Sequence, residues 1–218
     1  MMLGLKKSGL PRLSVGLIVI SPLVFLHTGL RDIVETHMAL HMLLQFPLLM
    51  VAGMSAMRLC AGHFCRLRLA WESINVHGLM TVAIVSCVAL YWMLPVALDE
   101  SLMSRSVAGF KYSSWFLAGC ALAAGPPRRM PVHVFFVGNM VWMLATAGLL
   151  YVEADSRLCV NYRFQDQAVT GLGLLAASCL ILVLAGARAL LAHQRPATDA
   201  SVGPLGKQAS RRKGTPER

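Results

Sequence analysis

Two histidines stand four residues apart in the apolar segment THMALHMLLQFPLLM, and each is followed by a methionine. In a helix, this spacing places His37 and His41 on one face, with Met38 and Met42 on the neighbouring stripe. Imidazole and thioether groups together suit a late transition metal, and thioethers favour reduced copper. The segment therefore predicts a copper site. The competing interpretation is that the histidines only satisfy backbone carbonyls and that the methionines are apolar filler.

Two further side chains are candidates for the same site. His27 lies near the end of the preceding apolar stretch and Met93 near the end of the following one, so both could reach the depth of the histidine pair. A weaker candidate is the segment CAGHFC, which carries the three soft ligands Cys60, His63 and Cys65. Structural zinc sites usually have four ligands with CxxC-type spacing, and no fourth ligand is obvious here.

The segments that must position these residues are mostly apolar. The 218 residues are 56% hydrophobic and 14% charged, whereas about a quarter of a soluble domain is charged. The charges lie between uncharged stretches, and about 20 apolar residues cross a bilayer as a helix. The stretches are 13–30, 36–57, 73–98, 112–127, 130–152 and 167–187. The sequence therefore predicts an all-α fold, a polytopic membrane helix bundle of about six transmembrane helices.

The fourth stretch is the shortest and begins beside Lys111. We expect this lysine to extend to the lipid headgroups, so that the helix starts near Val107. Basic residues precede the first stretch, as in a signal peptide, but no small-residue cleavage site follows, so we expect a retained helix. The predicted organisation is a cytoplasmic segment (1–12), a membrane domain (13–193) and a disordered basic cytoplasmic tail (194–218).

Basic residues set the orientation through the positive-inside rule. With a cytoplasmic N-terminus, 15 of the 20 Lys and Arg residues fall inside and seven of the ten acidic residues fall outside. We therefore predict a multi-pass protein of the plasma (inner) membrane with both termini cytoplasmic and with His37 and His41 near the outer, periplasmic face. The net charge of +10 follows from this topology. No basic patch is interleaved with aromatic residues, so the predicted partner is the lipid bilayer and not a nucleic acid.

Three segments resemble one known family. ETHMALHMLLQFPLLMVAG (35–53) resembles the HMxxHMLL…PLL…G helix of the CtaG-type multi-spanning cytochrome c oxidase assembly factors. LYWMLPVALDESLMSRSVAGFKYSSWFLAG (90–119) resembles the WHxP segment of that family and the helix after it, and YRFQDQAVTGL (162–172) resembles its DQxxxG element. The resemblance implies an accessory factor, not an enzyme, that helps to mature a haem–copper oxidase at its copper centres, with oxidase subunits as partners.

The resemblance transfers residue by residue only in part. His37 and His41 match the family histidines, and Asp166 and Gln167 match motif residues whose role the resemblance does not give. Three other family histidines are replaced, at Met93, Ala108 and Tyr112. The resemblance therefore implies a divergent member, which has either an altered metal affinity or a metal-free scaffold role.

Two alternatives remain open on the sequence alone. A b-type haem needs axial histidines on different helices at one depth. The pairs that satisfy this condition are His27 with His41 and His77 with His133. The other alternative is an inert membrane scaffold or a small transporter. Charge is nearly absent from the interiors of the stretches, and this absence counts against ion-coupled transport.

Overall fold

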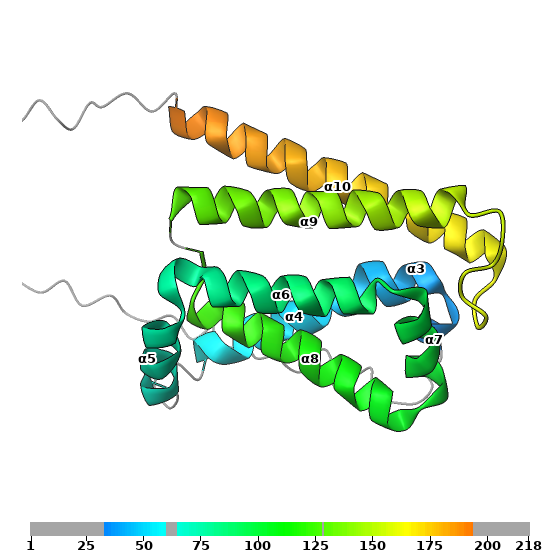
Figure 1. Ribbon diagram of the computed structural model, residues 1–218, viewed down its shortest axis with the longest axis horizontal. Helices are drawn as coiled ribbons and strands as arrows, with labels where there is room; N and C mark the ends of the chain where they lie inside the picture. The colour runs from blue at the N-terminus through cyan, green and yellow to red at the C-terminus, as the bar shows by residue number, and fades with distance from the viewer. Residues whose placement is uncertain (1–32, 60–64, 128, 194–218) are drawn as a thin grey trace, which may run out of the picture. The chain divides into compact units, whose positions relative to one another are not determined.

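The computed structural model describes residues 33–59, 65–127 and 129–193, which form helices joined by short connections and contain no strand. Figure 1 shows their arrangement. The helices are α3 (Met38–Leu40), η2 (His41–Gln45), α4 (Phe46–Leu59), α5 (Cys65–Ile74), η3 (Val76–Gly78), α6 (Leu79–Trp92), α7 (Pro95–Met103), α8 (Arg105–Ala124), α9 (Met130–Glu153) and α10 (Phe164–His193). The all-α prediction is confirmed for these residues. The chain divides into two units, 1–182 and 183–218, and the described part of the second is the end of α10.

Several predicted features lie outside the described residues. They are the N-terminal segment, the first predicted span, the C-terminal tail, His27, Cys60 and His63. Of the CAGHFC segment, the structure places Cys65, where α5 begins.

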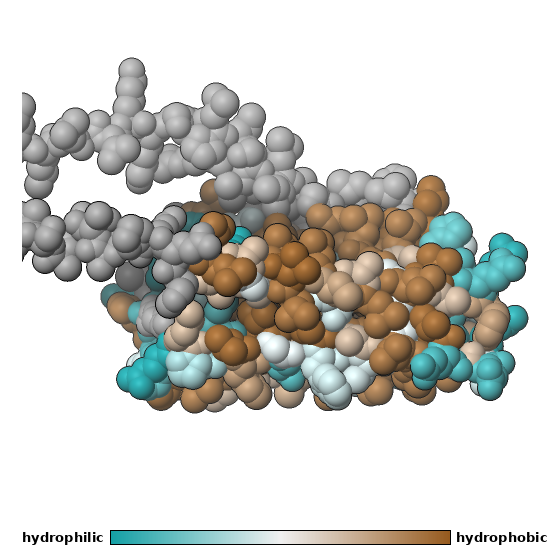
Figure 2. Space-filling view, turned by 90° about the horizontal axis from the view of Figure 1, so that it is seen from above, coloured by the Kyte–Doolittle hydropathy of each residue, from teal (hydrophilic) through white to brown (hydrophobic). Residues whose placement is uncertain are grey.

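Three helical stretches are long and apolar enough to cross a membrane. They are Met38–Leu59, Met130–Glu153 and Phe164–Leu191, and they correspond to the second, fifth and sixth predicted spans. On the face drawn in Figure 2, hydrophobic side chains gather along the middle of the helices and hydrophilic ones toward the two ends, as a bilayer requires. α8 is a helix of 20 residues that begins at Arg105, two residues before the expected start at Val107.

The third predicted span, 73–98, is not one continuous helix. α6 ends at Trp92, and α7 begins at Pro95. Proline has no N–H for the helix ladder and forces the residue before it into extended backbone, and Leu94 has φ −75° and ψ 130°. At the other end, the stretches Arg68–Ile74 and Val76–Trp92 meet at an angle of 81°. If these two stretches together form one bent span, the described residues contain four candidate membrane spans instead of three.

Glycines allow α4 and α8 to pack closely. A Cβ atom at Gly53 would lie 2.0 Å from the carbonyl oxygen of Phe116, and one at Gly119 would lie 2.1 Å from the carbonyl oxygen of Met50. If either glycine were replaced by a larger residue, the backbones of α4 and α8 would have to move apart. Small residues at the crossing are the usual means of bringing membrane helices together. This contact fixes α8, which carries Lys111 and Tyr112, against α4, which directly follows the turn η2 that carries His41 and Gln45.

Candidate functional site

His37 precedes α3 in extended backbone, with φ −105° and ψ 114°, so the two histidines do not share one helical face as predicted. After α3 the helix widens into a π-helix at His41–Gln45. Two residues later, Pro47 has no N–H to donate to the carbonyl of Leu43, and in a regular α-helix its ring would clash with that oxygen. A π-turn directly before the proline relieves this conflict, and such turns often occur at functional sites. The turn leaves His41 and Gln45 fully buried on the side of α8.

Both ring nitrogens of His41 are hydrogen-bonded. Nδ1 lies 2.5 Å from the hydroxyl oxygen of Tyr162, and Nε2 lies 2.9 Å from Nζ of Lys111. The same Nζ lies 2.7 Å from Oε1 of Glu35. His41 and Lys111 have no exposed surface, and Glu35 is 6% exposed. The result is a continuous hydrogen-bonded chain from Tyr162 through His41 and Lys111 to Glu35.

The charge of Lys111 fixes the direction of these bonds. An ammonium group has donors only, so Lys111 donates to Nε2 of His41 as well as to Glu35. Nε2 is then the acceptor, and a neutral imidazole carries its single proton on the other nitrogen. Nδ1 of His41 therefore donates to Tyr162, whose own hydroxyl proton is left to donate elsewhere.

Two more polar side chains extend the chain. The hydroxyl of Tyr112 donates to Oε1 of Glu35 over 2.8 Å, and the amide of Gln45 donates to the hydroxyl of Tyr112 over 3.1 Å. Together the residues Glu35, His41, Gln45, Lys111, Tyr112 and Tyr162 form what we call the polar junction. It joins the start of the second predicted span, α8 and the loop before α10, and it contains a buried ion pair.

A loop of residues 154–163 brings Tyr162 to the polar junction. Oε1 of Gln167 accepts from the backbone N–H of Leu158 over 2.9 Å, and its amide donates to the carbonyl of Tyr151 over 3.3 Å. The carboxylate of Asp99 accepts from the backbone N–H groups of residues 160 and 161 over 2.7 and 3.2 Å. Gln167, a motif residue of unassigned role, therefore holds this loop in place.

Two titratable groups of the loop are buried and neutral. Burial, with the negative charge of Asp99, raises the pKa of Cys159 from 9.0 to about 12. Burial, with the charge of Glu35 as the next cause, raises the pKa of Tyr162 well above its ordinary value. Both groups therefore keep their protons at neutral pH, and Tyr162 remains a phenol beside His41.

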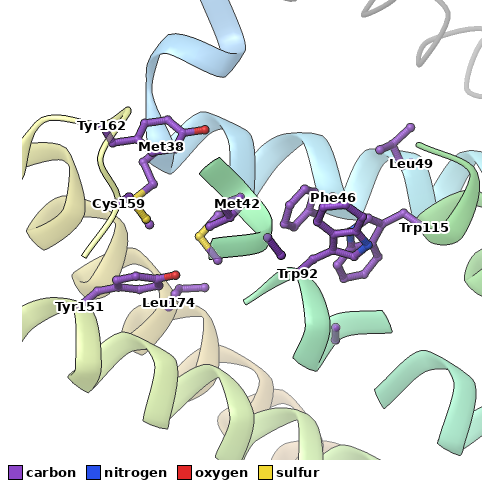
Figure 3. Packing of buried hydrophobic residues seen from close by; sticks show 13 residues of the cluster. Met38, Met42, Phe46, Leu49, Trp92, Trp115, Tyr151, Cys159, Tyr162 and Leu174 are labelled. Atoms are coloured by element: carbon purple, nitrogen blue, oxygen red, sulfur yellow. The ribbon is translucent and has the colours of Figure 1, made fainter. Parts of the chain in front are cut away.

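The other predicted ligands lie apart from the polar junction or at its edge. Met38 and Met42 are buried in the hydrophobic core beside Cys159, as Figure 3 shows. The side chain of His37 is 56% exposed, and its Nδ1 lies 3.9 Å from Oδ2 of Asp166. Met93 is half-buried, and its carbonyl accepts a hydrogen bond from Tyr151. The two histidines of the pair are thus in different surroundings, since His37 is exposed and His41 is buried.

The residues present do not fit a copper ion at His41 in this arrangement. Both ring nitrogens are in use, and the ammonium group of Lys111 stands 2.9 Å from the nitrogen that a metal ion would need. Among the described residues, no group of three or more His, Cys, Asp or Glu side chains is placed to hold a metal ion. The same bonds occupy the nitrogens that a haem iron would need at His41. His77 is half-buried and His133 is exposed, so neither is enclosed as an axial ligand usually is.

Of the six residues of the polar junction, the sequence pattern identified His41 as a site residue and did not identify the other five. Lys111 was expected to reach the lipid headgroups, and that expectation is wrong because its side chain is fully buried against Glu35 and His41. The signal was a lysine at the start of a predicted span, since a charged side chain inside a membrane generally faces a partner within the bundle. Tyr162 carried no signal, because its place depends on the fold of the loop.

Comparisons with known proteins give no relative from which to assign this site. No family model matches the sequence, and no curated protein and no solved structure matches it.

Proposed function

We propose that this chain is an integral membrane accessory factor for the assembly of a haem–copper oxidase, and that it acts as a scaffold without a resident metal. One observation supports this proposal above all. The three segments that resemble the assembly-factor family meet at His41, because the first supplies His41 and Glu35, the second supplies Lys111 and the third supplies Tyr162. Segments that carry one motif set are expected to build one site.

The chemistry of the polar junction favours the metal-free form. Lys111 supplies a positive charge between Glu35 and His41, which is where a bound cation would stand if the site held a metal. Of the two α8 positions where the family resemblance implies histidines, Ala108 is buried and has no ligand atom, and Tyr112 donates to Glu35. The side chains at these positions therefore contribute packing and hydrogen bonds.

A rigid outer end suits a scaffold. An ion pair that is buried and fully hydrogen-bonded costs several kcal/mol when one partner is lost, so the junction ties its three segments into one unit. The exposed side of that end, which includes His37 and the loop 154–163, is then presented in a fixed shape to a partner subunit in the membrane.

The proposal is tested in the native host by deleting the chain and restoring it with variants. We expect deletion to lower cytochrome c oxidase activity and the oxidase haem absorbance of the membranes. Restoration with His37→Ala should return both to the wild-type level, and added copper should not rescue the deletion. If deletion leaves both readouts unchanged, the chain has no role in oxidase assembly. If copper rescues the deletion and His37→Ala fails to, the chain handles copper.

Copper handling is the second candidate, and one observation favours it. Met38, Met42 and Cys159 are three sulfur-bearing side chains in a single buried cluster (Figure 3), and soft sulfur ligands select Cu(I). The raised pKa of Cys159 opposes it, since the thiolate is the form that binds metals. Loading the purified protein with Cu(I) decides the matter. Equal copper content in the wild type and in Met38→Leu/Cys159→Ser would remove this candidate.

A further inference from the structure

The helix α5 crosses the end of the bundle instead of continuing the direction of the spans. Its last part, Arg68–Ile74, stands at 81° to the stretch Val76–Trp92, and Figure 1 shows α5 across the end of the bundle. In the sequence, α5 connects the end of α4 to the start of α6. A helix at nearly a right angle to the spans, at their ends, has the orientation of a helix that lies in the membrane interface.

A buried asparagine holds this elbow rigid. Asn75 is 5% exposed, and its amide group donates to the hydroxyl of Thr81 over 2.8 Å and to the carbonyl of Gly125 over 3.0 Å. Its side-chain oxygen accepts from the backbone N–H of Thr81 over 3.2 Å. Gly78 completes the turn with φ +89°, where a Cβ atom would lie 2.6 Å from Pro127. The angle of α5 is therefore set by the fold.

Among the α5 side chains that the structure describes, the exposed ones are two arginines, three apolar residues and Ser73. Arg66 and Arg68 are exposed, and Leu69 and Ile74 are 60% and 59% exposed. Glu72 is the only acid in α5, and its Oε1 lies 3.2 Å from Nε of Arg68. Arg66 and Arg68 are two residues apart and so point to different sides of α5. When the helix axis lies in the interface, long arginine side chains on either side can still extend to the headgroups while apolar groups stay at the acyl boundary.

Other basic residues surround this end of the bundle. Arg58 in the last turn of α4 and Arg129 just before α9 are exposed. The opposite end carries acidic residues, among them Asp99 of α7 and Asp155 of the loop. By the positive-inside rule the end with α5 faces the cytoplasm, whose leaflet carries acidic lipids that attract basic segments.

We propose that α5 is an interfacial helix whose Arg66 and Arg68 bind the headgroups of acidic phospholipids in the inner leaflet. Guanidinium groups bind phosphate oxygens through paired hydrogen bonds. Leu69 and Ile74 anchor the helix at the depth where this contact forms. The proposal does not depend on the role in oxidase assembly, because it rests on the elbow and on the charges of one end.

The test compares the full chain in nanodiscs of phosphatidylcholine with and without phosphatidylglycerol. We expect acidic lipid to raise the unfolding temperature by about 2–4 °C for each arginine that binds it. The double variant Arg66→Gln/Arg68→Gln should lose most of this rise. The matched control Arg105→Gln/Arg157→Gln removes two exposed arginines from the opposite end and should keep the rise. An equal loss in both variants, or no rise in the wild type, would overturn the proposal.

A second variant should increase the effect of acidic lipid on the unfolding temperature. Its result therefore cannot be explained by a substitution that merely destabilises α5. Glu72 competes with lipid phosphate for Arg68, so Glu72→Gln should enlarge the rise produced by phosphatidylglycerol. High salt should remove the rise in unfolding temperature of the wild type, because at about 1 M salt the attraction between exposed charges extends only about 3 Å. A rise that is unchanged in Glu72→Gln and insensitive to salt would show that arginine–phosphate contacts do not produce it.

Discussion

At the scale of single residues, the buried pair of Lys111 and Glu35 governs the candidate site. Their atoms lie 2.7 Å apart, and Lys111 has no exposed surface. A charge sealed from water is tolerated only when it is paired and hydrogen-bonded. Glu35 accepts from Tyr112 as well, and Lys111 donates to His41 as well, so each charge has more than one partner.

Removing one member of the pair should be costly. Lys111→Met leaves Glu35 without its counter-ion, and we expect a loss of about 3–5 kcal/mol in the free energy of unfolding. The double variant Glu35→Gln/Lys111→Met should recover a large part of this loss, because neither charge is then left alone. Denaturant titration in detergent measures both. An additive double variant would show that the two side chains do not interact.

An exposed pair provides the control for this cycle. Arg68 and Glu72 lie 3.2 Å apart one helical turn from each other, with side chains 46% and 25% exposed. Breaking this pair with Arg68→Gln should cost less than about 1 kcal/mol. A similar cost for both pairs would mean that burial contributes nothing to the stability of the first.

The thiol of Cys159 predicts a pH dependence of stability. Its pKa in the folded protein is about 12, above the ordinary 9.0. The folded state therefore binds this proton more tightly than the unfolded state does, and the resulting stability is complete below pH 9 and is lost as the pH rises toward 12. The wild type should lose more stability between pH 8 and pH 10.5 than Cys159→Ala does. Parallel pH profiles for the two proteins would contradict the burial of the neutral thiol.

At the scale of elements, the residues of the polar junction are brought together by close helix contacts and by one hydrogen-bonded loop. α4 and α8 approach through Gly53 and Gly119, and this approach brings His41 and Lys111 within reach of each other. The loop 154–163 is ordered by side chains that bind its backbone, chiefly Gln167 and Asp99. The site thus depends on contacts that are far apart in the sequence.

The α4–α8 contact predicts a difference between two glycines. Gly53→Ala places a Cβ atom 2.0 Å from the carbonyl oxygen of Phe116, so the helices must separate, and we expect a loss of about 1–3 kcal/mol. Gly138→Ala in α9 meets nothing within 4 Å and should cause no loss. Thermal unfolding of both variants in one detergent measures the difference. Equal stability would show that α4 and α8 do not cross this closely.

The loop predicts a change in thiol accessibility. Gln167→Ala removes the acceptor of the Leu158 N–H and the donor to the Tyr151 carbonyl. The loop should then open more often, and Cys159 should react faster with a water-soluble maleimide in a variant that retains this cysteine alone. Gln165→Ala is the matched control, since its side chain is exposed. Unchanged reactivity in Gln167→Ala would show that Gln167 does not hold the loop.

At the scale of the whole molecule, much of the fold follows from the sequence and less of the site does. The apolar stretches predicted the helices now seen as α4, α9 and α10, because a long uncharged run has few alternatives in a membrane. The break at Pro95 also had a sequence signal. The pairing of Lys111 with Glu35 had none, since 76 residues separate them and helical periodicity does not state which helices meet.

These scales meet in the proposal that the polar junction at His41 is part of a metal-free scaffold for the assembly of a haem–copper oxidase. The most direct test is to purify the tagged chain from native membranes, with and without a copper chelator, and to measure the oxidase subunit that accompanies it. We expect equal recovery of that subunit under both conditions and a loss of it in Lys111→Met. Recovery that requires copper, or the absence of any oxidase subunit, would contradict it.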